Sequence, residues 1–323
     1  MTVAMRDRAP RPGSLVFHPP AMRPAIVRTL ACLLALVVSS SCRRDEGLVG
    51  TSGAPLVMVL SPGHGTDAVR VRELERLLSR ESGLTVEVRV APNSDSAVRM
   101  AGSPNTDAAL LTLFEYLFCR KLFGVSAALR VVRKGGATEH HGEILVKSDS
   151  EAKSLADLRG KKVAFVDRYS STGYVLPSKL LLDRGVNVEP VFTGSHEAAL
   201  AELRAGHAAA AATYAGAGAG SGDLRALAST PEVPNEPVFF RSRLAPDKRR
   251  QMVDALARIA RSDDGKRLLA GMADVEGFVP TTDDDYAAAR ALITSIGQSE
   301  RDLIPRGWTL SNEQERKPGD LAP

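Results

Sequence analysis

Short apolar runs alternate with helical patterns along this chain from Pro55 onward. Residues 56–60 (LVMVL) form a continuous apolar run, which is typical of a buried strand. Residues 84–90 (LTVEVRV) alternate with the period of two expected of a half-buried strand. Between these runs, apolar residues from 69 to 78 recur at helical spacing. The pattern therefore predicts a strand–helix–strand unit at the start of the folded region.

The same alternation continues through the rest of the chain. Further strands are expected at residues 107–111, 127–133, 142–148, 163–166, 188–192, 208–214 and 223–229. Helices are expected at residues 177–184, 196–205, 246–261 and 284–296. This order predicts an α/β fold in which mostly parallel sheets carry helices on both faces. A chain of 323 residues is long enough for two domains.

The positive charge of the chain is concentrated in its first 41 residues, which hold five arginines and a single acid. Removing them from the 42 basic and 38 acidic residues leaves 37 of each. The remainder is neutral, which argues against nucleic acid as a partner. A basic segment at 22–28 precedes an apolar run at 29–38 that is too short to span a membrane. This order predicts a signal peptide over residues 1–41, with Met22 as an alternative start.

Cys42 follows three serines directly, as the lipidated cysteine of a bacterial lipoprotein follows small residues. We therefore expect a lipid anchor at Cys42 and a tether over residues 42–54, with simple secretion as the alternative. Residues 301–323 read as a polar tail. Outside the signal and the anchor only Cys119 remains, so the folded region has no internal disulfide. Its apolar helical surroundings predict a buried, inert thiol.

Hydroxyl side chains gather where a helical pattern starts after the strand at 163–166. Ser170, Ser171 and Thr172 stand directly before Gly173, and Ser195-His196 opens a second helical run further on. Free N–H groups and the helix dipole favour negative charge at a helix N-terminus. Two such starts predict a receptor for a small oxyanion. The alternatives are an ordinary helix cap at residues 170–172 and a solvent-facing helix start at 196.

Several segments together carry a family resemblance; they are residues 154–177, 192–206, 229–240 and 277–292, with a weaker match at 107–117. The chain resembles the phosphate, phosphite and phosphonate solute-binding proteins of ABC importers. The resemblance implies a two-lobed periplasmic-binding-protein fold with the ligand in a cleft between the lobes. It assigns residues 55–140 and 242–300 to lobe 1 and residues 141–241 to lobe 2.

The resemblance also implies which residues bind the ligand. Ser170, Ser171 and Thr172 correspond to the hydroxyls that donate hydrogen bonds to the oxyanion. His196, preceded by Ser195, corresponds to a histidine that contacts it. Such neutral donors can replace the water around an oxyanion without an arginine clamp.

Three further ligand-binding candidates are less complete matches. Tyr116 corresponds to an aromatic contact from lobe 1, although its apolar helical neighbours favour a core role almost equally. His141 stands where the family carries a tyrosine, and Glu236 stands for an acid near the hinge. An acid that can hold the amine of an aminophosphonate has no counterpart in residues 213–218. The oxyanion half of the site is therefore intact, and the identity of the oxyanion stays open.

Other functions are less well supported. His140 and His141 lack the additional spaced ligands that a metal site needs, and His64 and His207 are expected at the surface. No cofactor is expected. An enzyme using Ser170 or Ser171 with His196 is disfavoured, because no G-x-S-x-G elbow is present and no third residue orients the histidine.

The sequence thus predicts a monomeric, non-enzymatic receptor in the periplasm. It is expected to be held at the inner or outer membrane through Cys42 and to deliver its oxyanion to an ABC permease. An anion sensor that signals to a membrane partner and a drifted paralogue with a different ligand are the alternatives.

Overall fold

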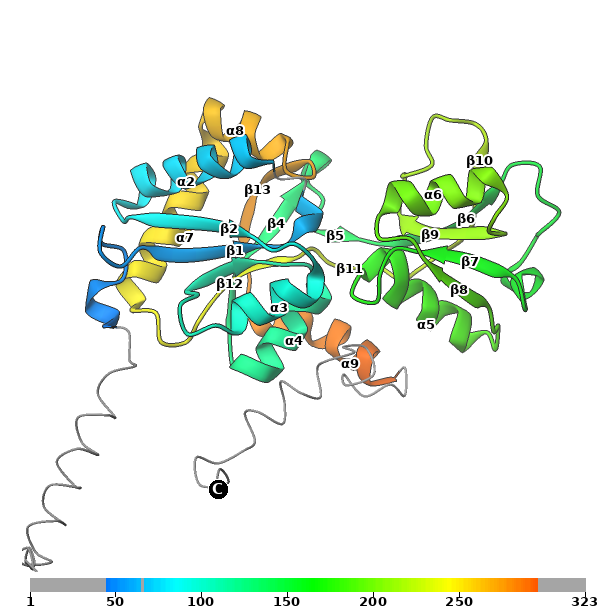
Figure 1. Ribbon diagram of the computed structural model, residues 1–323, viewed down its shortest axis with the longest axis horizontal. Coiled ribbons are helices and arrows are strands. Elements are labelled where there is room, and N and C mark those ends of the chain that lie inside the picture. The colour runs from blue at the N-terminus through cyan, green and yellow to red at the C-terminus, as the bar shows by residue number, and fades with distance from the viewer. Residues whose placement is uncertain (1–44, 65–66, 296–323) are drawn as a thin grey trace, which may run out of the picture. The chain divides into compact units, whose positions relative to one another are not determined.

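A computed structural model describes residues 45–64 and 67–295 (Figure 1). The predicted signal peptide, the anchor at Cys42 and the polar tail at 301–323 lie outside the described residues. Within the described ranges, no helix is long and apolar enough to cross a membrane.

The first of two main sheets has six strands, which follow one another in the order β13 (Val275–Pro280), β4 (Ser126–Arg133), β12 (Pro237–Phe240), β3 (Ala108–Leu110), β1 (Leu56–Leu60) and β2 (Val86–Val90). Strand β1, next to the edge strand β2, is fully buried along its length and pairs in parallel with both β2 and β3. The pairs β12–β3, β12–β4 and β13–β4 are antiparallel.

The second sheet has five strands, in the order β10 (Leu224–Ser229), β6 (Gly142–Lys147), β9 (Ala210–Tyr214), β7 (Lys162–Phe165) and β8 (Glu189–Phe192). Strand β7 pairs in parallel with β8 and β9, whereas β6 pairs antiparallel with β9 and β10. The predicted α/β fold of two helix-flanked sheets is confirmed, but both sheets are mixed and not mostly parallel.

The mixed pairing follows from the way the chain passes between the sheets. It leaves the first sheet through β5 (Glu139–His140) and returns through β11 (Val233–Pro234), and these two short strands pair antiparallel. Strand β4 precedes the crossing to the second sheet, and β12 follows the crossing back to the first. The two strands therefore run in opposite directions and pair antiparallel. Because β12 already belongs to the first sheet, the return lies before residue 237, somewhat earlier than the predicted boundary at 241.

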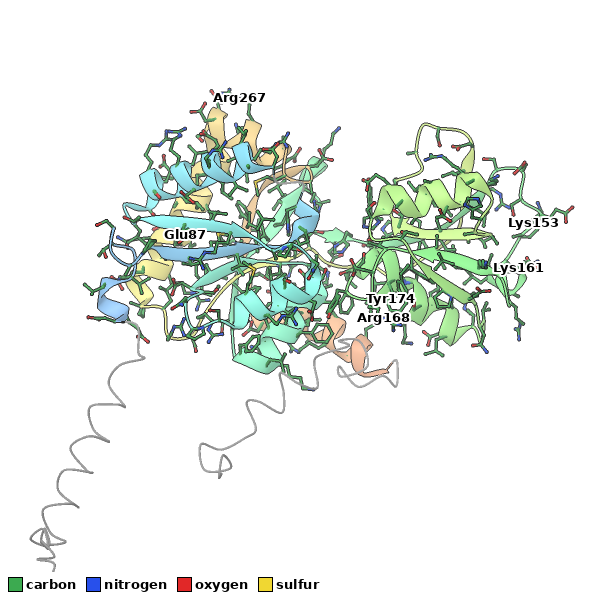
Figure 2. All side chains as sticks on the ribbon, viewed as in Figure 1. Glu87, Lys153, Lys161, Arg168, Tyr174 and Arg267 are labelled. Atoms are coloured by element: carbon green, nitrogen blue, oxygen red, sulfur yellow. The ribbon has the colours of Figure 1, made fainter. Side chains whose placement is uncertain are left out.

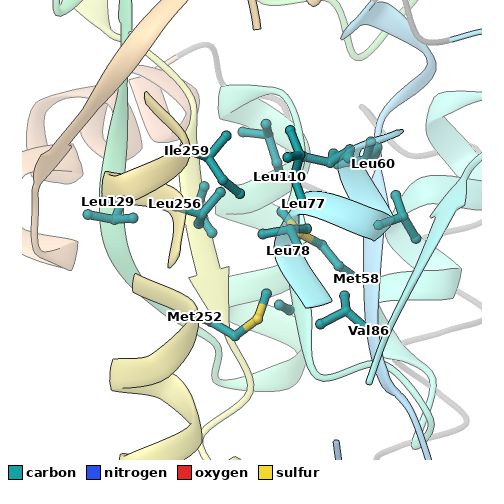
Figure 3. Packing of buried hydrophobic residues seen from close by; sticks show 14 of the residues in the cluster. Met58, Leu60, Leu77, Leu78, Val86, Leu110, Leu129, Met252, Leu256 and Ile259 are labelled. Carbon is teal, nitrogen blue, oxygen red and sulfur yellow. The ribbon is translucent and has the colours of Figure 1, made fainter. Parts of the chain in front are cut away.

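Helices cover both faces of the first sheet. One face carries α2 (Ala68–Ser82), α7 (Pro246–Arg261) and α8 (Asp263–Ala270), and the other carries α3 (Ser94–Gly102), α4 (Leu113–Phe123) and α9 (Ala287–Ser295). Figure 3 shows the hydrophobic core between the first sheet and the helices α2, α7 and α8. Here Leu77 and Leu78 of α2 and Leu256 of α7 pack against strand side chains such as Met58. Burying a side chain of this size contributes about 1.5–3 kcal/mol, so this core holds the first sheet to its helices.

The second sheet is also covered on both faces. Helix α5 (Leu176–Asp183) packs through Leu181 on one face, and α6 (His196–Ala205) packs through Leu200 and Leu203 on the other. The predicted range of α6 is confirmed, and its ends follow from local signals. Ser195 caps its N-terminus, and Gly206 ends it with a left-handed φ of 76°.

Candidate anion-binding site

Three parallel strands of the second sheet bring the two hydroxyl-rich segments together at the carboxyl ends of the strands. Strand β7 lies between β8 and β9, and all three run in the same direction. The loop after β7 leads to Ser170, and the loop after β8 leads to Ser195. The two loops are bonded side by side, because Thr193 N donates to Phe165 O and Gly194 N donates to Val166 O, each at 2.9 Å. Ligands bind at such carboxyl ends of parallel strands in α/β sheets.

The helix after β7 begins earlier than the sequence predicted, with a wide turn called η5 (Ser171–Val175) that has π-helical bonding and runs into α5. Pro177 sits inside this continuous run and has no N–H to donate to the carbonyl of Gly173. That carbonyl instead accepts from Val166 N of the preceding loop, at 3.1 Å. The bond ties the start of the helix to the end of β7.

A short polar network holds the loop before this helix. The Asp167 carboxylate accepts from the backbone N–H groups of Tyr169 (2.7 Å) and Ser170 (3.0 Å). Burial raises the pKa of Asp167 above its ordinary value of 3.8, although these two bonds act in the opposite direction. Ser170 Oγ accepts from Gly173 N at 3.1 Å, so Ser170 is the helix cap that one of the alternatives anticipated.

Ser171 differs from Ser170, because its hydroxyl is buried and has no hydrogen-bond partner. Its side chain is 7% exposed, and its Oγ is one of three buried side-chain polar atoms without a partner among the described residues. A buried hydroxyl without a bond costs about 1–3 kcal/mol. Thr172 beside it is also buried. An unsatisfied hydroxyl at the positive end of a helix is the arrangement expected where a ligand supplies the missing acceptor.

His196 is the first residue of α6, on the neighbouring loop. Its Nδ1 lies 3.0 Å from Thr213 Oγ1 of β9, and the edge of the Tyr214 ring packs against its ring at a centroid distance of 5.0 Å. Burial lowers the pKa of His196, although the nearby Glu197 acts to raise it. Ser195 Oγ accepts from Ala198 N at 3.1 Å, so this hydroxyl caps the helix.

Gly142, the first residue of β6, brings these elements close together. A Cβ placed on Gly142 would lie 2.9 Å from the carbonyl oxygen of Thr172 and 3.3 Å from that of Thr213. A side chain at this position would push the turn carrying Thr172 away from β9, which carries the partner of His196. The absence of a side chain therefore allows the buried hydroxyls and the histidine to share one edge.

Aromatic side chains support the start of the helix from the side. The Tyr174 ring packs edge-on against Phe165 and Phe192, at centroid distances of 5.3 and 5.1 Å. Arg168, labelled with Tyr174 in Figure 2, lies over the Phe192 ring at 5.0 Å. Tyr169 reaches the first sheet's helices, because its hydroxyl donates to Asp95 at the start of α3 (3.3 Å).

Tyr116 lies in the core of the first sheet. The residue is fully buried on α4, its hydroxyl donates to Asp283 Oδ1 at 2.5 Å, and its ring packs against Phe239 and Tyr286. Its hydroxyl is therefore occupied within the protein. This placement favours the core role that the sequence left as an alternative.

Glu236 lies at the return crossing, before β12. It is buried, accepts a hydrogen bond from Arg133 of β4, and lies 3.4 Å from His64 Nε2. Burial alone would raise its pKa, but hydrogen bonding from His64 and the charge of Arg133 outweigh burial and hold the pKa well below its ordinary value. The prediction that His64 lies at the surface was wrong, because His64 is 2% exposed and pairs with this carboxylate.

His141 borders the candidate site through its backbone. It directly precedes Gly142, and its carbonyl accepts from Ala215 N just beyond β9, at 3.1 Å. The nearest acid to its imidazole is the exposed Glu232, 3.9 Å away. Nowhere in the described part of the chain do three or more His, Cys, Asp or Glu side chains gather so that they could hold a metal ion.

Sequence reasoning missed three residues that shape this edge: Asp167, Gly142 and Thr213. Asp167 carried a usable signal, since an aspartate in a loop often accepts hydrogen bonds from the backbone N–H groups two and three residues further on. Gly142 and Thr213 act on segments distant in the sequence, so no local pattern indicates them.

Two mixed sheets, joined by the antiparallel pair of crossing strands β5 and β11, define the class of protein. This is the fold of the periplasmic binding proteins, which are solute receptors and not enzymes. Residues 64–286 match the family of periplasmic substrate-binding proteins of phosphonate ABC transporters, and the chain belongs to that family.

Individual relatives are more distant. The chain is 26% identical over 192 residues to the phosphate-import protein PhnD of Mycolicibacterium smegmatis, an alignment that spans 53% of this chain and 59% of that protein. A binding protein of an ABC phosphonate transporter from Pseudomonas aeruginosa has a TM-score of 0.64 at 15% identity, covering 80% of this chain and 95% of its own. PhnD1 from Prochlorococcus marinus in complex with methylphosphonate also has a TM-score of 0.64, at 16% identity, covering 76% and 98%. These structural likenesses concern the fold.

Proposed function

We propose that this protein captures a small phosphorus oxyanion, of the phosphonate, phosphite or phosphate type, and delivers it to an ABC permease. The observation that carries the proposal is the buried hydroxyl of Ser171, which has no partner within residues 45–64 and 67–295 and stands at a helix N-terminus. An oxyanion would accept from this hydroxyl and from nearby backbone N–H groups. The names of the relatives, a phosphate importer and a protein complexed with methylphosphonate, support the same ligand class.

The proposed contacts come from the second sheet. Ser171 and Thr172 supply buried hydroxyls, and His196 supplies a ring nitrogen from the adjoining helix start. Ser170 and Ser195 serve as caps whose side-chain oxygens accept from backbone N–H groups, and each can still donate its hydroxyl proton to the anion. Tyr116 and Glu236 are engaged within the protein and lie outside the proposed contacts.

We also propose that Cys42 carries a lipid that holds the protein at a bacterial membrane facing the periplasm. The support is the order of basic, apolar and small residues before Cys42. The predicted tether over residues 42–54 is too long, because Val49 already packs in the core of the first sheet and Gly50 O accepts from Thr85 N at 2.7 Å.

Thermal unfolding against a panel of anions tests the proposed ligand class. The panel is phosphate, phosphite, methylphosphonate, 2-aminoethylphosphonate and sulfate. A ligand present at 100 times its Kd stabilises the folded state by about 2.7 kcal/mol, so its midpoint of unfolding rises measurably. We expect at least one phosphorus oxyanion to raise the midpoint well above sulfate. Equal midpoints across the whole panel would contradict the proposal.

A further inference from the structure

Thr213 on β9 is fully buried, and its side chain contacts the candidate site through one hydrogen bond. Its Oγ1 lies 3.0 Å from His196 Nδ1, and its exposed fraction is 0%. Within the described residues, no other hydrogen bond of this hydroxyl is found. The proton of the hydroxyl therefore has one available acceptor, the imidazole ring.

The donors and acceptors of this pair can be arranged in two ways. A neutral imidazole carries one N–H and one nitrogen lone pair, and a hydroxyl donates one hydrogen bond. If Nδ1 carried the proton, it would donate to Thr213, and the buried hydroxyl proton would have no acceptor. If Thr213 donates to Nδ1, the ring proton sits on Nε2 and the pair is satisfied. An unsatisfied buried donor disfavours the first arrangement by a factor of about 5 to 150.

The choice of tautomer decides what His196 offers to a ligand. With the proton on Nε2, the neutral ring presents an N–H donor on the side away from Thr213. With the proton on Nδ1, it would present a lone pair, which repels an oxyanion. The Tyr214 ring, edge-on to His196 at an angle of 75°, packs against the imidazole and helps to fix its orientation.

We propose that Thr213 is a positioning residue that holds His196 in the Nε2–H tautomer, so that the neutral imidazole donates a hydrogen bond to the bound oxyanion. This inference rests on the proposed function and adds that every side chain offered to the anion is an uncharged donor. Strand β9, which pairs with β7 in the sheet, thereby also carries the residue that orients His196. The lowered pKa of His196 agrees with a neutral ring.

Nitrogen NMR of the ligand-free protein, labelled with ¹⁵N at histidine, tests the tautomer directly. The His196 signals are assigned by their loss in His196→Gln. We expect wild type to show a protonated Nε2 and an acceptor Nδ1. Thr213→Val keeps the shape of the side chain but removes the hydroxyl, and should give a mixture of tautomers. Thr213→Ser keeps the hydroxyl and should restore the wild-type pattern.

Affinity for the panel anion that binds best supplies the second readout. We expect Thr213→Val to weaken binding by about 5- to 30-fold and Thr213→Ser to stay within about threefold of wild type. A protonated Nδ1 in wild type, or unchanged affinity in Thr213→Val, would overturn the inference. An Nε2–H ring in a protein that binds none of the anions would overturn the proposed function, and with it the role given to Thr213.

Discussion

At the scale of single residues, two buried polar side chains differ in whether the protein supplies them with hydrogen-bond partners. Glu236 is fully engaged, since Arg133 and His64 both face its carboxylate. Ser171 has no bond in the described structure and is equally buried. Engaged groups of the first kind stabilise the fold, and an unsatisfied group such as the Ser171 hydroxyl is the basis on which we propose a ligand contact. This difference separates Glu236 from the proposed contacts, although the sequence placed both residues in one set.

Glu236→Gln should destabilise the protein by about 3 kcal/mol, because it removes the charge that compensates Arg133 at a buried position. Urea unfolding measures the change. Glu73→Gln removes an acid from an exposed ion pair with Arg76 and serves as the control, with little expected change. Equal stability of the two variants would contradict the structural role of Glu236.

The pH dependence of stability follows from the same carboxylate. Its pKa is held below the ordinary value of 4.5, so the unfolded chain takes up a proton before the folded protein does. The stability that Glu236 contributes is therefore fully present above pH 4.5 and is lost as the pH falls through the lower, folded pKa. Below pH 4.5 the stability of Glu236→Gln should fall less steeply than that of wild type. Parallel curves would contradict this assignment.

At the scale of elements, close packing of β6 against η5 holds the candidate site together. Gly142→Ala adds a methyl group 2.9 Å from Thr172 O, where a backbone atom must move to make room. We expect a loss of about 1–3 kcal/mol in urea unfolding and a weaker affinity for the anion, because the turn carrying Thr172 is displaced. Gly53→Ala, which meets no atom within 4 Å, is the matched control. Wild-type affinity in Gly142→Ala would mean that the turn does not form part of the site.

The sequence predicted those elements whose signals are local. Helices 196–205 and 246–261 were predicted with the bounds that the structure has, because a serine or a proline marks their starts. Strands β12 and β13 were missed, since short strands that pair with distant segments have no periodic pattern long enough to read. For the site, the hydroxyl cluster and His196 were identified, but the partners that orient them were not. The burial of His64 was also missed, because it depends on Glu236 far along the chain.

At the scale of the whole molecule, family and architecture agree with the sequence resemblance. Two mixed sheets, joined by the β5–β11 crossing, form the frame on which the candidate site is built. The resemblance implied a ligand in a cleft between two lobes, and the crossing strands β5 and β11 are the short segments that join the two sheets. The proposed oxyanion site lies on the second sheet, where Ser171 lacks a partner among the residues that the structure describes.

The most direct test of that claim is calorimetric titration of wild type and Ser171→Ala with the anion that stabilises the protein best. We expect Ser171→Ala to bind about 10- to 150-fold more weakly, because one charge-assisted hydrogen bond is lost. Its unfolding free energy should be unchanged or slightly higher, since the missing hydroxyl had no partner in the free protein. Ser154→Ala removes an exposed serine hydroxyl that precedes β7 and bonds to Asp157, and this variant should bind as wild type does. Wild-type affinity in Ser171→Ala would contradict the account.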